Sequence, residues 1–473
     1  MEEQRFIRHV PRVLAALFLV SCGDQTTLVE EQPTPPRHLV VISIDTLRAD
    51  RLGSYGYTRN TSPNLDRLAE KSRVYRAVTS TAPSTAASHM SMLTGVYPPV
   101  HGVHNVALGP NQRDQSEATQ IAVAPTNLPT LAETLHKEGF VTAAFTDSGY
   151  LTEDFQFDRG FDVFKSQPED IKQKVNRALG WLDQADPEQP TFLFFHTYQV
   201  HTPYAPPVAF DQFSNPDYDG PVRQRVEEIR NAKSGGGLRH AKKFLPSAHK
   251  TTADDREYLS DLYDAEILYT DTHLERLLSA LQEPPWAGNT AILVTSDHGE
   301  AFFEHGSLGH GSLFDTDLHV PFILYIPGEE PVVIETPASG VDTTPTVLDL
   351  LGLPSSYLCD GQSLLGPTET GRPLFSFQKK PGMWGIAARQ NQNKIIRQRN
   401  PESWDQFDLS TDPGEQTMLT AEDPASKNLI RFAEQTLETQ LEVGAALRES
   451  SETDSSTLSE DTIQRLIELG YVR

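Results

Sequence analysis

Five short apolar segments constrain the fold more than any other feature of this chain. Each is rich in β-branched or aromatic residues and has no polar face, which is typical of strands that are buried on both sides of a parallel sheet. These strands are predicted at residues 38–45, 141–147, 191–198, 290–297 and 319–327.

Segments with apolar residues at helical spacing lie between these strands. They cover residues 62–72, 129–139, 170–185 and 254–281, and the first opens with Ser62 and Pro63, a cap residue and a first-turn proline. Because strands and helices alternate, we predict an α/β fold with a mostly parallel sheet flanked by helices.

The N-terminus carries a targeting signal. Arginines precede an apolar run at residues 13–21, which is too short to span a bilayer but fits the core of a signal peptide. The run ends in LVSCG, which resembles a bacterial lipobox. We therefore predict a lipoprotein signal peptide over residues 1–22 and membrane attachment through a lipid on Cys22, with ordinary secretion as the alternative. The protein is then expected in the cell envelope, outside the cytoplasm.

Composition divides the rest of the chain. Residues 23–37 are polar and proline-containing, and are predicted to be a flexible tether. A catalytic domain is predicted over 38–355, and a small C-terminal α+β subdomain with a helical tail over 356–473. The polar stretch at 210–250 is either a surface loop or an insertion that contacts substrate. If Cys22 is lipidated, Cys359 has no partner for a disulfide bond.

The charge balance limits the partners. The chain has 40 Lys and Arg against 65 Asp and Glu, a formal charge of −25. This excess of acid argues against a nucleic-acid-binding protein, which would present a basic face. A small anionic substrate is still compatible, because a metal ion can invert the local field in one cleft.

Polar residues follow three of the predicted strands, where an open α/β sheet binds ligands. They are Asp45, the pair Asp297–His298, and His201. Each alone also has a structural explanation, as a helix cap or a turn residue. Thr85 precedes another helical segment, where it is either an N-cap or a hydroxyl nucleophile facing an anion at the helix N-terminus.

The ordered motifs of the chain resemble the sulfatase family of the alkaline phosphatase superfamily, from about residue 38 onward. The motifs are IDTLRADRLGSYGY, SPNLDRLA, MLTGVYPPVHGV, HTPY, SDHGE, VPFILYIPG, VDTTPTVLDLLGLP, GQSL, FDLSTDPGEQ and LGYV. The resemblance implies a metal-dependent enzyme that acts on a sulfate or phosphate ester.

The chain departs from the family pattern at the nucleophile. Sulfatases carry a Cys or Ser that is oxidised to formylglycine within a C/S-x-P-x-R motif. Here Thr85 occupies that position, followed by Ala87 and His89 in place of Pro and Arg. Threonine cannot yield the aldehyde because its β-carbon already bears a methyl group. The family's later Lys is replaced by His310.

The resemblance implies which residues bind the metal ion and which take part in the reaction. Asp45, Thr85, Asp297 and His298 would bind a divalent metal ion, with Mn²⁺ or Zn²⁺ favoured and Ca²⁺ or Mg²⁺ as alternatives. Thr85 would be the nucleophile, His201 would contact the transferred group or protonate the leaving oxygen, and His310 and His89 would stabilise charge. His305 is a weaker candidate, and structural roles are predicted for His196, Asp342 and Asp412.

Three functions are compatible with this pattern. The first is a metal-dependent hydrolase of sulfate or phosphate esters that uses Thr85 and a covalent intermediate. The second is a phosphoglycerol- or phosphoethanolamine-type transferase. The third, of another class, is a lipid-anchored binding protein without catalytic activity, which would hold no stoichiometric metal.

Overall fold

The computed structural model describes residues 35–105, 120–231, 251–354, 358–366, 369–398, 400, 402–419, 424–452 and 455–469. The predicted signal peptide, Cys22 and most of the predicted tether lie outside these residues. Residues 35–473 form one compact unit. Among the helices of the described residues, none combines the length and the apolar character that crossing a membrane requires.

The core of this unit is a mixed sheet with the strand order β13-β2-β12-β8-β1-β7-β5-β6. Strands β8, β1, β7, β5 and β6 run parallel, and β12 is antiparallel to both of its neighbours. The prediction of a mostly parallel sheet is therefore confirmed. The strands are β1 His38–Ile44, β2 Arg73–Tyr75, β5 Val141–Thr146, β6 Val163–Ser166, β7 Thr191–Thr197, β8 Thr290–Thr295, β12 Phe322–Tyr325 and β13 Val332–Ile334.

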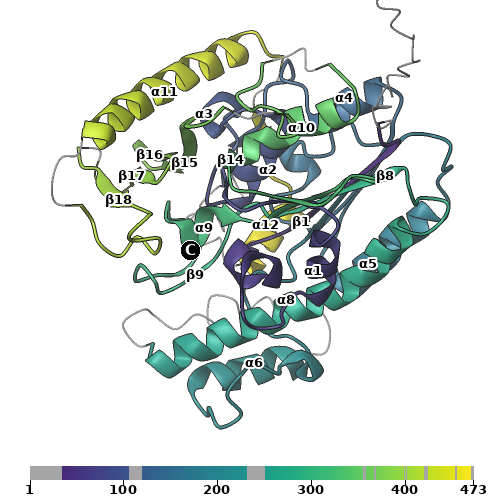
Figure 1. The fold of residues 1–473 in the computed structure, drawn as a ribbon, viewed down its shortest axis with the longest axis horizontal. Coiled ribbons are helices and arrows are strands. Elements are labelled where there is room, and N and C mark those ends of the chain that lie inside the picture. Colours follow the sequence, from purple (N-terminus) through teal and green to yellow (C-terminus); the bar gives the residue numbers. More distant parts are fainter. Residues whose placement is uncertain are drawn as a thin grey trace, which may run out of the picture. The chain divides into compact units, whose positions relative to one another are not determined.

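Helices cover both faces of the sheet (Figure 1). Alternate residues of β1 point to opposite faces, so Leu39 and Val41 enter one core and Val40 and Ile42 the other. The first core is covered by α2 Thr85–Thr94, α4 Leu131–Lys137 and α10 Thr343–Leu350. The second is covered by α1 Pro63–Ala69, α5 Ile171–Leu182 and α8 Ala253–Leu281, with α6 Pro221–Asn231 packed on α8.

The apolar run at 319–327 is not one strand. Pro321 lacks an amide donor and divides it into β11 His319–Val320 and β12. The first half joins a small sheet with β3 Val78–Thr79 and β14 Ala338–Ser339. The connection from β8 to β11 contains β9 Ala301–Phe302, β10 Leu308–Gly309 and α9 Asp315–Leu318.

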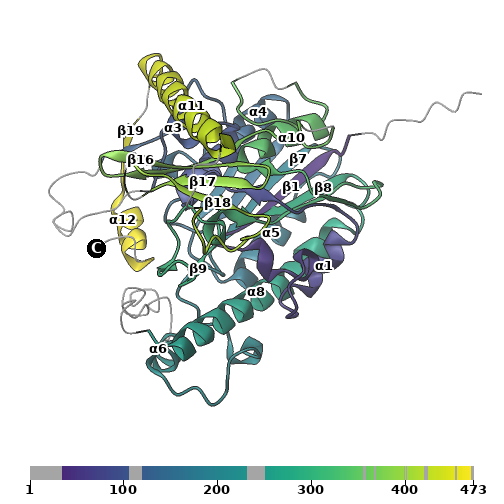
Figure 2. The same cartoon turned by 60° about the vertical axis from the view of Figure 1, so that its left-hand side comes forward.

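The C-terminal part contains the predicted small subdomain. Four antiparallel strands carry α11 Pro424–Glu449 on one face, as Figure 2 shows. The tail then returns to the main sheet: β19 Ser455–Thr457 pairs with β4 Gln120–Ala122, and Leu466 of α12 Glu460–Glu468 enters the first core. The four strands are β15 Leu374–Lys380, β16 Met383–Gln390, β17 Asn393–Arg397 and β18 Asp405–Asp408.

Candidate active site

The carboxyl ends of the central parallel strands bring the predicted site residues together. Asp45 follows β1, and Asp297 and His298 follow β8, its neighbour in the sheet. One ligand atom from each of these three residues lies within 4.8 Å of the others. All three are buried. The prediction that they converge on one point therefore agrees with the geometry of the sheet.

The backbone around these ligands is held tightly. Thr46 adopts a left-handed conformation (φ 58°), and its amide donates to Asp297 Oδ1 at 3.2 Å. Such a conformation costs energy in a β-branched residue and is typical of functional sites. A Cβ atom at Gly299 would lie 2.2 Å from the carbonyl oxygen of Thr316, so the SDHGE segment needs glycine there.

Thr85 begins α2 and faces the three ligands. Ser84 is the N-cap residue, so the structure does not use Thr85 as a cap. The Thr85 hydroxyl lies 3.4 Å from Asp45 Oδ2 and 3.4 Å from His298 Nε2, and the residue is 0% exposed. The side chain of Asn105 accepts from the Ala86 amide, which fixes the start of the helix.

The charges of this group favour a bound cation. Asp45 Oδ1 and Asp297 Oδ2 are buried and have no hydrogen-bond partner among the described residues. Burial and the nearby Asp297 carboxylate raise the pKa of Asp45. The carboxylates of Asp45 and Asp297 lie close together, each has one oxygen without a hydrogen-bond partner, and the neutral imidazole of His298 lies beside them. This set of donor atoms fits a divalent metal ion.

Both ring nitrogens of His89 lie within hydrogen-bonding distance of an oxygen atom. Its Nδ1 lies 2.9 Å from the carbonyl oxygen of Thr85, and its Nε2 lies 2.8 Å from the Ser43 hydroxyl. Asp297 Oδ2 is 3.6 Å from Nδ1. Burial lowers the pKa of His89, so the ring is neutral. These contacts tie the start of α2 to β1 and to the metal ligands.

His196 was predicted to be structural, but it contacts the candidate site. It lies near the end of β7, and its Nε2 is 3.3 Å from Asp45 Oδ2. Its ring also packs edge-on against His89 and Tyr198. No sequence signal separates it from the apolar residues of its strand, because only the strand register reveals that it faces Asp45.

His201 and His310 form the other wall of the site. The His310 ring lies 4.4 Å from the His298 ring and 5.2 Å from the His201 ring. Glu300 Oε1 is 3.2 Å from His310 Nδ1, and the Thr202 carbonyl is 2.7 Å from His201 Nδ1. Burial lowers the pKa of both histidines to about 4, so both rings are neutral at pH 7 in the metal-free protein.

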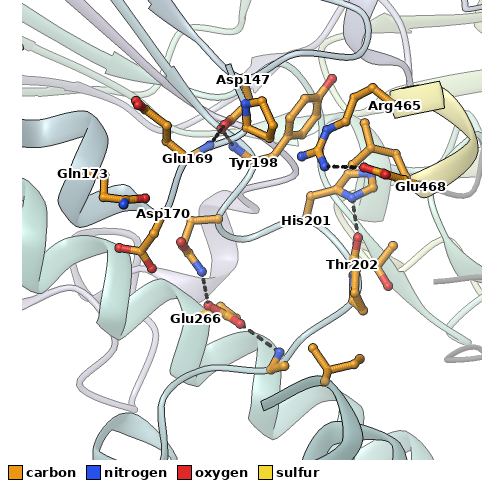
Figure 3. Close-up of a pocket in the computed structure, with 16 residues that line it drawn as sticks. Asp147, Glu169, Asp170, Gln173, Tyr198, His201, Thr202, Glu266, Arg465 and Glu468 are labelled. Atoms are coloured by element: carbon orange, nitrogen blue, oxygen red, sulfur yellow. Dashed lines mark hydrogen bonds and ion pairs between the residues drawn. The ribbon is translucent and has the colours of Figure 1, made fainter. Parts of the chain in front are cut away.

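A cavity of about 450 Å³ opens beside His201 (Figure 3). Tyr198 lines it, and the Tyr198 ring lies 4.8 Å from the His196 ring. The far wall includes Arg465 and Glu468 of α12, which the sequence did not point to. Through Tyr198 and His196, which contacts Asp45, the cavity lies beside the candidate site.

The remaining candidates lie in other contacts. His305 stacks on Phe314 with the ring centroids 3.6 Å apart. Asp342 pairs with Arg372, and Asp412 accepts from the amides of a turn. Cys359 is partly buried, and burial raises the pKa of its thiol to about 11.

Sequence comparison identifies the family. The family model "Sulfatase" matches residues 37–353. Human iduronate 2-sulfatase is 25% identical over 362 residues, which are 65% of this chain and 62% of the human protein. An arylsulfatase of Clostridium perfringens is 24% identical over 445 residues, 81% of this chain and 90% of that protein. The chain thus spans less than two thirds of the human relative and most of the bacterial one.

Solved structures share the fold. The phosphonate monoester hydrolase of Agrobacterium radiobacter superposes with a TM-score of 0.67 at 20% identity, covering 90% of this chain and all of that one. BT4656, solved with D-glucosamine-2-N,6-O-disulfate, gives a TM-score of 0.68 at 18% identity, covering 86% and 98%. These comparisons confirm the predicted fold. The chain belongs to the sulfatase family.

Proposed function

We propose that this protein hydrolyses sulfate or phosphate esters with Thr85 as an unmodified nucleophile. The observation that carries the proposal is the position of the Thr85 hydroxyl, 3.4 Å from both Asp45 Oδ2 and His298 Nε2. A hydroxyl at a helix N-terminus and beside metal ligands faces the place where a tetrahedral anion is stabilised. The relatives named as sulfatases and as a phosphonate monoester hydrolase support both ester classes.

Asp45, Asp297 and His298 would hold a divalent metal ion, with Thr85 as the fourth ligand. Their oxygens and the imidazole suit Mn²⁺ or Zn²⁺, and Ca²⁺ or Mg²⁺ are the alternatives. When bound, the ion would lower the pKa of the Thr85 hydroxyl and offset negative charge on the substrate.

The side chains then account for a two-step reaction. Thr85 gives up its hydroxyl proton to water, its Oγ attacks the sulfur or phosphorus atom, and the bond between that atom and the alcohol oxygen breaks. His201 lies on the cavity side and would donate the proton to that oxygen, because an anionic substrate raises the pKa of a neighbouring imidazole. Water then attacks the threonine ester and releases sulfate or phosphate. His310, oriented by Glu300, would donate a hydrogen bond to the transferred group.

The test is a paired assay after metal analysis of the purified protein. Bis-p-nitrophenyl phosphate and p-nitrophenyl sulfate are supplied side by side to wild type, Thr85→Ala and the matched control Ser84→Ala. We expect metal-dependent turnover of at least one ester, a loss of about a thousandfold or more in Thr85→Ala, and little change in Ser84→Ala.

Two outcomes would contradict the proposal. Turnover that survives Thr85→Ala would exclude this residue as the nucleophile. Absence of turnover together with absence of stoichiometric metal would favour a binding protein without catalytic activity.

We also propose that the protein is anchored outside the cytoplasm through a lipid on Cys22. The LVSCG sequence after the apolar run supports this, as does the polar segment that separates it from the domain. In a bacterial host, wild type should sediment with membranes and resist a high-salt wash, whereas Cys22→Ser should be recovered in the soluble fraction. Equal fractionation of the two would refute the anchor.

A further inference from the structure

The proposed function takes Thr85 as the attacking group and His201 as the donor to the leaving oxygen, which would place the alcohol part of an ester at the cavity beside His201. An inference about this cavity therefore rests on the proposed function. The cavity is lined by the ends of β5 and β7, by α8 and by the C-terminal helix α12. Its volume, about 450 Å³, suits the alcohol part of a small ester.

Arg465 of α12 has unused hydrogen-bonding capacity at this cavity. The residue is 7% exposed, and its Nη1 is 3.3 Å from Glu468 Oε2. Its buried Nε has no hydrogen-bond partner among the described residues. Figure 3 shows its side chain directed toward Tyr198 and His201. A buried guanidinium with one long contact is costly unless a further acceptor satisfies it.

The carboxyl groups of the cavity, in contrast, already have donors. Asp147 pairs with Lys174 at 2.8 Å, and Glu169 pairs with Arg177. Glu266 accepts from Gln199 Nε2 and from the Ala205 amide, and burial raises its pKa to about 8, which keeps it largely neutral at pH 7.

Asp170 caps α5 and accepts from the Tyr269 hydroxyl. Each of these carboxyl groups is thus satisfied within the protein. Among the described residues that line the cavity, Arg465 Nε and the hydroxyls of Tyr198 and Thr202 lack a hydrogen-bond partner. Of these three groups only Arg465 carries a positive charge, so the cavity is better matched to an anionic group than to an ammonium group.

We propose that Arg465 is a specificity-determining residue that binds a second negative charge on the alcohol part of the substrate. The preferred esters would carry a carboxylate, or another sulfate or phosphate, beside the ester that is cleaved. The planar guanidinium can meet two oxygens of such a group at once.

The test compares three aryl esters of whichever acid the enzyme cleaves. They are the 4-nitrophenyl ester, its 3-carboxy derivative and its 3-aminomethyl derivative. In wild type, kcat/KM should be highest for the carboxylate. In Arg465→Gln that preference over the parent ester should fall about 10- to 100-fold, which is the range for loss of one charged hydrogen bond, while the parent ester changes by about twofold or less.

Two further variants sharpen the comparison. Arg465→Lys should retain part of the preference, because it keeps the charge but loses the fork of donors. Arg276→Gln, which removes an exposed arginine that contacts Asn176 and does not line the cavity, should leave the preference unchanged. A preference that is the same in wild type and Arg465→Gln, or a preference for the ammonium ester, would overturn the proposal.

Binding of the product alcohol separates this inference from the proposed reaction. Isothermal titration calorimetry with 5-hydroxy-2-nitrobenzoate should give an affinity about tenfold or more weaker in Arg465→Gln than in wild type, and far-UV circular dichroism should show that both are folded. If the enzyme turns over esters but this difference is absent, the inference fails and the proposed function stands. If no ester is cleaved, the proposed function fails, and the binding difference still decides the role of Arg465.

Discussion

Asp45 has a proposed role in metal binding, and its effect on stability can be measured separately. In the metal-free protein its carboxylate faces that of Asp297, and burial and this neighbour raise the pKa of Asp45. Asp45→Asn should weaken metal binding by more than the 10- to 100-fold that losing an outer partner costs, as measured by competition with a chelator.

The same substitution should not destabilise the metal-free fold, because it removes a like-charge contact. The melting temperature of metal-free Asp45→Asn should equal or exceed that of metal-free wild type at pH 8. The exposed substitution Asp183→Asn is the control for both readouts. A large drop in the melting temperature of metal-free Asp45→Asn would show that Asp45 is a structural residue.

His89 distinguishes positioning from direct contact with the substrate. The sequence predicts that it stabilises charge on the transferred group, but both of its ring nitrogens are within hydrogen-bonding distance of Thr85 and Ser43. If it positions Thr85, His89→Leu should lower kcat about 10- to 100-fold with little change in KM, because losing the hydrogen bonds of a buried group costs about 1–3 kcal/mol.

Ser43→Ala keeps the contact between His89 and the Thr85 carbonyl, so its effect on kcat should be smaller. Steady-state kinetics on the ester that is cleaved gives both constants. A rise in KM as large as the fall in kcat would instead support the role first predicted for His89.

At the scale of elements, the sequence predicts where the strands lie more reliably than which strands pair with each other. Continuous apolar runs place β1, β5, β7 and β8 within a residue or two, because burial on both faces leaves a clear pattern. The position of Asp45 beside Asp297 follows once those strands are parallel and adjacent. The pairing of β19 with β4 was not predictable, because it joins short segments that are far apart in the sequence and carry no pattern.

One buried ion cluster links the C-terminal sheet to the main domain. Lys394 of β17 lies 2.5 Å from Asp315 at the start of α9 and 2.6 Å from Glu415 in the turn after β18. Lys394→Met would leave Glu415 without its cation and Asp315 with only the longer contact to Arg389, at 3.7 Å. We expect a loss of about 3–5 kcal/mol in the free energy of unfolding, measured by urea denaturation.

Lys379→Met is the matched control, since Lys379 is exposed on β15 of the same sheet and packs over Trp384. Lys379→Met should lower the free energy of unfolding by about 1 kcal/mol or less. Equal losses in the two variants would show that the buried cluster adds nothing specific to the junction.

For the whole molecule, the site is assembled from both ends of the described chain. The proposed metal ligands follow strands of the main sheet and Thr85 begins α2, where motif and strand position predict them. Arg465 comes from the last helix, and nothing in its local sequence marks it as a cavity residue. Its position depends on the tail returning to the first core through Leu466, which is a property of tertiary packing.

The pH dependence of stability tests the protonation of Glu266, a buried carboxyl group that lines the cavity. Glu266 of α8 is buried against the segment after β7, and burial raises its pKa from 4.5 to about 8. The folded protein therefore holds this proton between about pH 4.5 and 8, whereas the unfolded chain releases it. The contribution of Glu266 to stability is greatest below about pH 4.5 and declines as the pH rises to about 8. Within that range the contribution of Glu266 to the free energy of unfolding should fall by about 1.4 kcal/mol for each pH unit.

Glu266→Gln removes this titration and keeps the acceptor for Gln199 and Ala205. Its unfolding free energy should exceed that of wild type at pH 8 and approach it at pH 5, when urea denaturation is repeated across that range in the metal-free protein. Glu257→Gln, at an exposed position of the same helix, should follow wild type at every pH. If Glu266→Gln and wild type differ by the same amount at both pH values, the carboxyl group does not hold its proton in the fold, and the cavity carries one more negative charge near Arg465.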